Sequence, residues 1–95
     1  MWFAVLHYVY ILRSSRDGKR YLGCTRNLAD RLRRHNQGLV KATKPRAPWE
    51  LIHVEEYPGA AEAFAREKSL KSWAGRIELG RILGSQGRGS TTKAG

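Results

Sequence analysis

The stretch YLGCTRNLADRLRRHNQG, residues 21–38, decides the fold because its pattern changes from strand to helix in the middle. Its first residues, up to Thr25, include aromatic and β-branched side chains that are typical of a strand. Asn27 then carries a short polar side chain that can cap a helix, leucines recur at helical spacing, and Gly38 can end the helix. We therefore predict a strand followed directly by a helix over about residues 28–37.

The segments on either side complete an α+β pattern. Strand-like runs lie at 8–12, 20–25 and 51–57, and helix-forming runs lie at 60–72 and, in a shorter pattern, at 73–83. Asp17-Gly18 marks a hairpin turn between the first two strands, whereas residues 40–48 contain two prolines and predict a basic loop. The expected order of elements is therefore β-β-α-β-α-α.

The length and composition predict one small domain. A chain of 95 residues has room for a single core, and we expect the folded domain to span residues 1–83. Residues 84–95 are rich in small and polar residues without an apolar anchor, which predicts a disordered basic tail. Cys24 is the only cysteine and the apolar opening segment is too short to span a bilayer, so we expect a cytoplasmic protein that does not enter a membrane.

The charge of the chain points to a polyanionic partner. Eighteen Lys and Arg residues against eight Asp and Glu residues give a formal net charge of +10, and residues 13–46 hold eleven of the basic residues but only two of the acids. We expect a nucleic acid, DNA in the first place and RNA as the alternative, although a basic surface that serves only solubility would have the same composition. The candidate nucleic-acid-binding residues are Arg13, Arg20, Arg26, Arg33, Arg34, Lys41, Lys44 and Arg46.

Two tyrosines of the predicted hairpin, Tyr10 and Tyr21, are candidate site residues. Because side chains alternate along a strand, any hairpin loop of even length puts both rings on one face of the sheet. A four-residue loop, Ser14 to Asp17, would make them direct cross-strand neighbours, whereas a two-residue turn at Asp17-Gly18 would offset them. The sequence leaves both registers open, and simple packing of the two rings is the alternative to a functional role.

Arg31 and His35 lie at the edge of the apolar stripe of the first predicted helix. The stripe consists of Leu28, Leu32 and Leu39, and at about 100° per residue the two polar side chains fall beside it. Being four residues apart, they are neighbours that can reach toward the sheet. The alternative is that Arg31 only lays its stem along the core and that His35 only makes a hydrogen bond at the core margin.

Glu67 is the most unusual residue of the second predicted helix, because its helical phase places it on the apolar face. That face is built from Ala60, Ala63, Phe64, Leu70 and Ala74. A carboxylate there is costly unless a cation, a hydrogen-bond donor or a metal pairs with it. A buried ion pair with an arginine such as Arg31 is the structural alternative.

Taken together, these residues resemble the motifs of the GIY-YIG nuclease superfamily. The motif positions are Tyr8-Val9-Tyr10, Tyr21-Leu22-Gly23, Arg31, His35 and Glu67. The similarity covers residues 8 to about 75 and is strongest over 21–38. Within the superfamily, the chain is most similar to small single-domain bacterial proteins related to the nuclease half of the excision-repair incision enzyme. Two features depart from the pattern: Tyr8 stands where the name-giving glycine would be, and no asparagine near the C-terminus matches the one that some members place beside the site.

The resemblance implies a fold, an activity and a set of roles. It implies a three-stranded antiparallel sheet with helices packed against it, and a metal-dependent endonuclease that hydrolyses phosphodiester bonds in DNA, in repair or in the processing of unusual DNA structures. The implied catalytic residues are Tyr10, Tyr21, Arg31, His35 and Glu67. Glu67 would be the ligand of one divalent metal, Mg²⁺ or Mn²⁺, and Tyr10 is the tyrosine expected to orient or deprotonate the attacking water.

Two other functions are compatible with the sequence. One is a nucleic-acid-binding module that keeps the fold without cutting, which the missing asparagine supports. The other is a nuclease subunit that depends on a protein partner for specificity, with Trp49, Trp73 and Tyr57 as contact residues unless these side chains serve only for packing. Metal-dependent nicking by the isolated chain would separate an enzyme from both. The sequence leaves the oligomeric state open.

Overall fold

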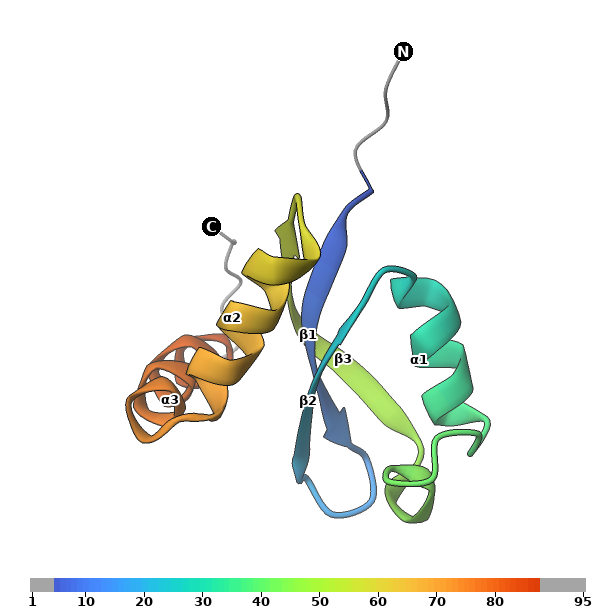
Figure 1. The fold of residues 1–95 in the computed structure, drawn as a ribbon. Coiled ribbons are helices and arrows are strands. Elements are labelled where there is room, and N and C mark those ends of the chain that lie inside the picture. The colour runs from blue at the N-terminus through green and yellow to red at the C-terminus, as the bar shows by residue number, and fades with distance from the viewer. Residues whose placement is uncertain (1–4, 88–95) are drawn as a thin grey trace.

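The computed structural model (Figure 1) describes residues 5–87, and in this range it has three strands, three α-helices and one short 3-10 helix. The elements are β1 (His7–Ser14), β2 (Arg20–Thr25), α1 (Leu28–Asn36), η1 (Lys44–Arg46), β3 (Trp49–Tyr57), α2 (Ala60–Lys71) and α3 (Trp73–Gly87). The predicted order β-β-α-β-α-α and the α+β class are therefore confirmed.

The three strands form one antiparallel sheet in the order β2-β1-β3, with β1 in the centre. Tyr10 lies opposite Gly23, and Tyr21 lies opposite Leu12. The hairpin loop is the four-residue segment 15–18, closed by a hydrogen bond of 2.8 Å from the Ser14 amide to the Lys19 carbonyl. An even loop was expected to put the two tyrosines on one face, and it does. Their actual offset lies between the two registers considered from the sequence.

Helices cover both faces of the sheet (Figure 1). On one face, α2 and α3 pack over a buried cluster formed by Val9, Ala63 and Leu70. On the other face, α1 packs over a second cluster that contains Tyr10, Leu12 and Trp49. Val9 and Tyr10 are neighbours in β1, so their side chains point to opposite faces and belong to different clusters. The two predicted catalytic tyrosines therefore lie on the α1 side.

Both ends of α1 are closed by the residues expected from the sequence. The Asn27 side chain accepts a hydrogen bond of 3.0 Å from the Asp30 amide. Gly38 has a φ of +74°, and the amides that follow the helix bond back to the His35 carbonyl at 3.2 Å and the Arg34 carbonyl at 2.9 Å. Leu39 lies beyond this cap and is 53% exposed, so the prediction that it continues the apolar stripe is wrong.

The buried face of α2 is rotated from the one predicted. Ala63 and Leu70 are buried as expected, but Phe64 is 60% exposed, and Ala74 is an exposed residue of α3. Two charged side chains flank the buried pair Ala63 and Leu70: Glu67, with 21% of its side chain exposed, and Arg66, with 23% exposed. A pattern of apolar residues does not predict the position of Arg66, because it counts a partly buried arginine as a polar position.

Arg66 turns inward because two carboxylates bind it. Its guanidinium donates to Glu55 on β3 at 2.8 and 3.0 Å and to Glu78 on α3 at 3.2 and 3.0 Å. Burial alone would raise the pKa of Glu55, but hydrogen bonds from Arg66, His53 and Tyr57 outweigh it and lower that pKa to about 2. This network ties β3, α2 and α3 together and fixes the helix that carries Glu67.

Three boundaries differ from the predictions. β3 begins at Trp49 rather than at residue 51, and α1 ends at Asn36. α3 continues to Gly87, past the boundary expected at residue 84. The rest of the predicted tail, 88–95, and the opening residues 1–4 lie outside the described part of the chain. Within residues 5–87, the structure has no helix of the length and apolar character that spanning a bilayer would require.

Candidate active site

Tyr10 occupies its position because Gly23 has no side chain. The Tyr10 ring lies across β2, and a Cβ atom on Gly23 would come within 2.5 Å of the Tyr10 Oη. Any larger residue at position 23 would push the ring away from its place on the sheet. This close approach gives a physical reason for the glycine that ends the motif Tyr21-Leu22-Gly23.

A buried chain of hydrogen bonds joins Tyr10, His35 and Thr43. Tyr10 Oη is 2.9 Å from His35 Nε2, and His35 Nδ1 is 2.7 Å from Thr43 Oγ1. The Thr43 hydroxyl also donates to the Val40 carbonyl at 3.3 Å. Because the Thr43 hydroxyl proton is used in this bond, its oxygen accepts from the N–H at His35 Nδ1. His35 Nε2 then carries no proton and accepts from the Tyr10 hydroxyl. The three groups therefore satisfy one another with a neutral imidazole.

Burial holds Tyr10 and His35 in their uncharged forms. Tyr10 is 1% exposed and His35 is 0% exposed. Burial, followed by the neighbouring Tyr21, raises the pKa of Tyr10, and burial, followed by the charge of Arg31, lowers the pKa of His35. A raised pKa disfavours a tyrosinate, so Tyr10 is better suited to orient a water molecule than to deprotonate one.

Tyr21 and Trp49 enclose this chain on the α1 side of the sheet. The Tyr21 ring centroid is 5.0 Å from that of His35, and 6.3 Å from those of Tyr10 and Trp49. The Trp49 indole donates to the Thr43 carbonyl at 3.1 Å, and Trp49 is 5% exposed. Packing is therefore the role of Trp49, and the suggestion that it is a surface contact for a partner protein is wrong.

The end of α1 is fixed to the start of β3 by Asn36. Its side chain donates to the Trp49 carbonyl at 3.2 Å and accepts from the Trp49 amide at 2.5 Å. This pair sets the height of α1 against the sheet, and with it the position of His35. Thr43 and Asn36 were not singled out in the sequence, because neither lies in a periodic pattern that would indicate burial.

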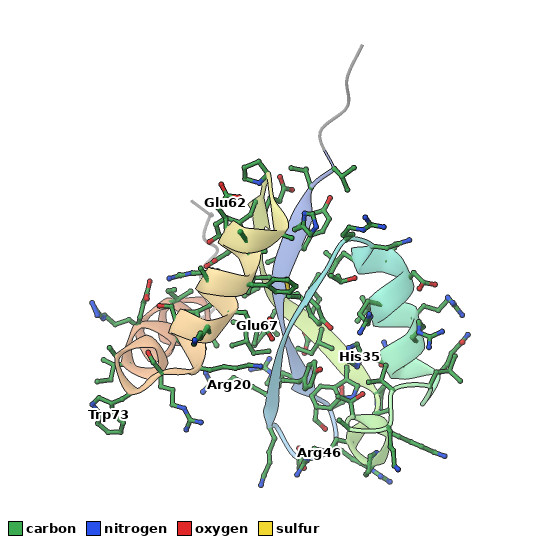
Figure 2. The ribbon with its side chains drawn as sticks, viewed as in Figure 1. Arg20, His35, Arg46, Glu62, Glu67 and Trp73 are labelled. Carbon is green, nitrogen blue, oxygen red and sulfur yellow. The ribbon has the colours of Figure 1, made fainter. Side chains whose placement is uncertain are left out.

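Arg31 and Glu67 are the charged members of the predicted site, and both are partly buried. The positive charge of Arg31 acts to lower the pKa of Tyr10, whereas the negative charge of Glu67 acts to raise it, although burial has the larger effect. Both charges therefore lie within electrostatic reach of the Tyr10 hydroxyl. Figure 2 places Glu67 on α2 and His35 on the α1 side of the sheet, so the site spans both sides of β2.

Glu67 is not bound to Arg31, so the structural alternative considered for this residue is not what the structure contains. Its carboxylate accepts from Lys71 at 2.9 Å, one turn along α2, and the Lys71 side chain is 55% exposed. An exposed pair of this kind is weak, so the carboxylate can exchange its partner at little cost.

Glu67 offers one carboxylate that could hold a hydrated divalent metal. Among residues 5–87 there is no group of three or more His, Cys, Asp and Glu side chains that could hold a metal. Mg²⁺ keeps several waters and takes one or two carboxylates together with substrate phosphate oxygens. A single accessible carboxylate such as Glu67 fits that requirement, whereas a structural zinc site needs four protein ligands.

The eight candidate nucleic-acid-binding residues do not form one surface. Arg13 and Arg20 lie on the α3 side, where they line a cavity with Gly80 and Leu83, whereas Arg26, Arg33 and Arg34 lie around α1. Three members have acidic partners: Arg13 with Glu50 at 3.5 Å, Arg33 with Asp30 at 2.6 Å, and Arg46 with Asp17 at 3.0 Å. Clustering in the sequence therefore overstates clustering in space.

The fold and the clustered motif residues are those expected of the GIY-YIG nuclease family, and the comparison with known families agrees. The GIY-YIG catalytic domain matches residues 6–79, so the chain belongs to this family.

Similar proteins include small bacterial ones. A UPF0213 protein of Oceanobacillus iheyensis is 42% identical over 66 residues, which is 68% of this chain and 76% of that protein. A UPF0213 protein of Staphylococcus aureus is 36% identical over 74 residues, 77% of this chain and 89% of that protein. The solution NMR structure of the UPF0213 protein BH0048 from Bacillus halodurans has a TM-score of 0.50 and 32% sequence identity, covering 81% of this chain and 84% of that one.

Proposed function

We propose that the chain is a divalent-metal-dependent endonuclease that hydrolyses phosphodiester bonds in DNA. The observation that carries this proposal is the buried Tyr10–His35–Thr43 chain, which lies within electrostatic reach of one cation, Arg31, and one carboxylate, Glu67. Arg31 comes from α1 and Glu67 from α2, and the charges of both influence the buried Tyr10 hydroxyl. Packing of the core would not require such an arrangement. Hydrolysis of a phosphodiester requires such groups, because charge develops on the phosphate oxygens during attack.

The residues divide the work of binding and orientation. Arg31 carries a planar fork of donors that suits the non-bridging phosphate oxygens. Tyr21 is partly exposed and would hydrogen-bond the same phosphate. Glu67, together with waters, would hold Mg²⁺ or Mn²⁺, and such an ion neutralises charge on the phosphate and on the leaving 3′-oxygen.

Tyr10 and His35 act as one orienting unit. Because the Tyr10 hydroxyl donates its proton to His35 Nε2, its oxygen lone pairs stay free to accept from the attacking water. His35 is held in the required tautomer by Thr43. This arrangement favours a role for Tyr10 in orienting water over a role as a tyrosinate base.

The rival proposal is a nucleic-acid-binding module that does not cut, and cleavage by the purified chain decides between them. The protein is incubated with supercoiled, branched and single-stranded DNA and with RNA, with Mn²⁺ or with EDTA. We expect nicking of DNA that requires the metal and is lost in Arg31→Ala, while DNA affinity falls only slightly. Binding of every substrate without cleavage would refute the enzyme. Cleavage that appears only with a cell extract would indicate that a protein partner is needed.

The setting of this activity is part of the same proposal. One cysteine, Cys24, is partly buried and burial raises its pKa, so it is a poor nucleophile and fits a reducing cytoplasm. Repair, or the processing of unusual DNA structures, would supply substrates for a nuclease of this size. The comparison of substrates above tests that assignment directly.

A further inference from the structure

Three arginines gather on the side of the hairpin that faces α3, away from the Tyr10–His35 chain. Arg13 and Arg20 are cross-strand partners in β1 and β2. Like charges directly opposite each other in a sheet are destabilising. The third member, Arg76, comes from α3 and shares a cleft of about 360 Å³ with Arg20 and Leu79. We call these three residues the α3-side arginines.

The charge of this cluster is incompletely compensated. Among residues 5–87 neither Arg20 nor Arg76 makes an ion pair, and Arg13 has only Glu50, at 3.5 Å with both side chains about half exposed. Glu50 also lines the adjoining cavity of about 440 Å³ that contains Arg13 and Arg20. Only one of the three guanidinium groups thus has a carboxylate partner, and that pair is weak, which favours an external anion.

The space beside the arginines is open enough for such an anion. Gly80 and Gly84 of α3 line the larger cavity, and a Cβ atom at either position would meet no other atom within 4 Å. Figure 2 shows Arg20 reaching from β2 toward α3, on the same side of the sheet as Glu67. An anion held there would therefore lie on the same side of the sheet as Glu67.

We propose that the α3-side arginines bind a phosphate of the DNA backbone that flanks the scissile one. This inference rests on the proposed function, because it takes the substrate strand to cross the edge of β2. Arg20 and Tyr21 are consecutive in β2, so they present their side chains on opposite sides of that strand. A backbone that meets Tyr21 on one side then meets Arg20 and Arg76 on the other, where guanidinium forks match phosphate oxygens.

The test is the salt dependence of DNA binding in EDTA, which prevents cutting. Fluorescence anisotropy gives the affinity of the full chain and of Arg76→Gln at several salt concentrations. The matched control is Arg81→Gln, which removes an exposed arginine of the same helix that turns to a different face. We expect the slope of log affinity against log salt to flatten by about 0.7–0.9 in Arg76→Gln, the value for one lost phosphate contact. Arg81→Gln should keep the wild-type slope.

Arg20→Gln and modified DNA locate the contact. Arg20→Gln should flatten the slope as Arg76→Gln does, and circular dichroism confirms that each variant is folded. A methylphosphonate placed at single backbone positions should weaken wild-type binding at one flanking position and weaken the binding of Arg76→Gln less at that position. An equal slope in wild type and both variants would overturn the inference. A second result would also overturn it: inorganic phosphate raises the melting temperature of the wild type, while the salt dependence of DNA affinity is the same in the variants as in the wild type. The site would then bind free phosphate rather than DNA.

The outcome is separable from that of the proposed nuclease. A chain that binds DNA through Arg20 and Arg76 but never cuts supports this phosphate site and refutes the enzyme. A chain that nicks DNA with Mn²⁺ and shows wild-type slopes in both variants supports the enzyme and overturns the phosphate site.

Discussion

Gly23→Ala tests the geometry of the candidate site most directly, because it adds one methyl group where the Tyr10 ring lies. The added Cβ would be 2.5 Å from the Tyr10 Oη and 2.6 Å from Cζ. Tyr10 is 1% exposed and its ring packs against Tyr21 and His35, so it has no free space into which to move. We expect the ring to be displaced and its hydrogen bond to His35 to be lost.

The expected cost has two parts. Overpacking a buried position destabilises by about 1–3 kcal/mol. A buried Nε2 left without its partner adds about 1–3 kcal/mol. Gly23→Ala should therefore lower the free energy of unfolding by roughly 2–6 kcal/mol, a large share of the ~5–15 kcal/mol that stabilises a typical domain. It should also abolish cleavage, since Tyr10 would no longer orient water.

Equilibrium unfolding in urea measures the first effect and a nicking assay the second. Gly18→Ala is the matched control, because Gly18 has a φ of +76° but no atom within 4 Å of the added Cβ. It should cost only the left-handed strain of about 1–2 kcal/mol and leave cleavage intact. Tyr10→Phe removes the hydroxyl that meets the new methyl group. In this background, Gly23→Ala should therefore lower the free energy of unfolding by less than it does in the wild type. A Gly23→Ala protein as stable and as active as the wild type would refute this geometry.

Three further results are expected from the ionisable residues. Glu67→Gln should abolish metal-dependent nicking and weaken Mn²⁺ binding. The melting temperature without metal should stay close to that of the wild type, because only the exposed ion pair with Lys71 is lost. Strong destabilisation together with normal cutting would contradict this. The free energy of unfolding should fall as the pH drops through about 6.5. His35 has a lowered pKa in the folded protein, so below this pH the unfolded chain binds a proton that the folded protein does not. His35→Gln should remove this part of the pH dependence of stability. Arg66→Met should cost up to about 3–5 kcal/mol, measured by urea unfolding, because it removes the cation that binds the partly buried Glu55 and leaves this carboxylate only its hydrogen bonds with His53 and Tyr57. Glu55→Gln should reduce the loss of stability between pH 4.5 and about 2.

The local parts of the fold could be predicted from the sequence because they depend on neighbouring residues. The Asn27 cap and the Gly38 end of α1 each involve residues within five positions along the chain. The strand runs and the order of elements follow from patterns of the same range. The shared face of Tyr10 and Tyr21 also followed, since it required only an even loop.

What could not be predicted depends on contacts between distant segments. The partly buried position of Arg66 depends on Glu55 and Glu78, which lie 11 and 12 residues away, so an apolar pattern did not predict which charged residue flanks the buried face of α2. The third member of the hydrogen-bond chain, Thr43, lies in a loop without periodicity. The basic residues of 13–46 looked like one patch, but consecutive elements carry them to different sides of the sheet, and Arg76 joins them only in space.

The sides of the sheet on which Tyr10, His35 and Glu67 lie place the proposed site at β2. Tyr10 and His35 lie on the α1 side and Glu67 on the α2 side, and the helices cover the middle of both faces (Figure 1). A substrate of the proposed nuclease could therefore meet both sets of residues only around an edge of the sheet. Of the two edge strands, β2 is the one over which the Tyr10 ring lies, at Gly23. β2 has six residues and begins with the charged Arg20. Short, charged edge strands resist pairing with a further strand, so the edge of β2 stays open to a phosphate backbone.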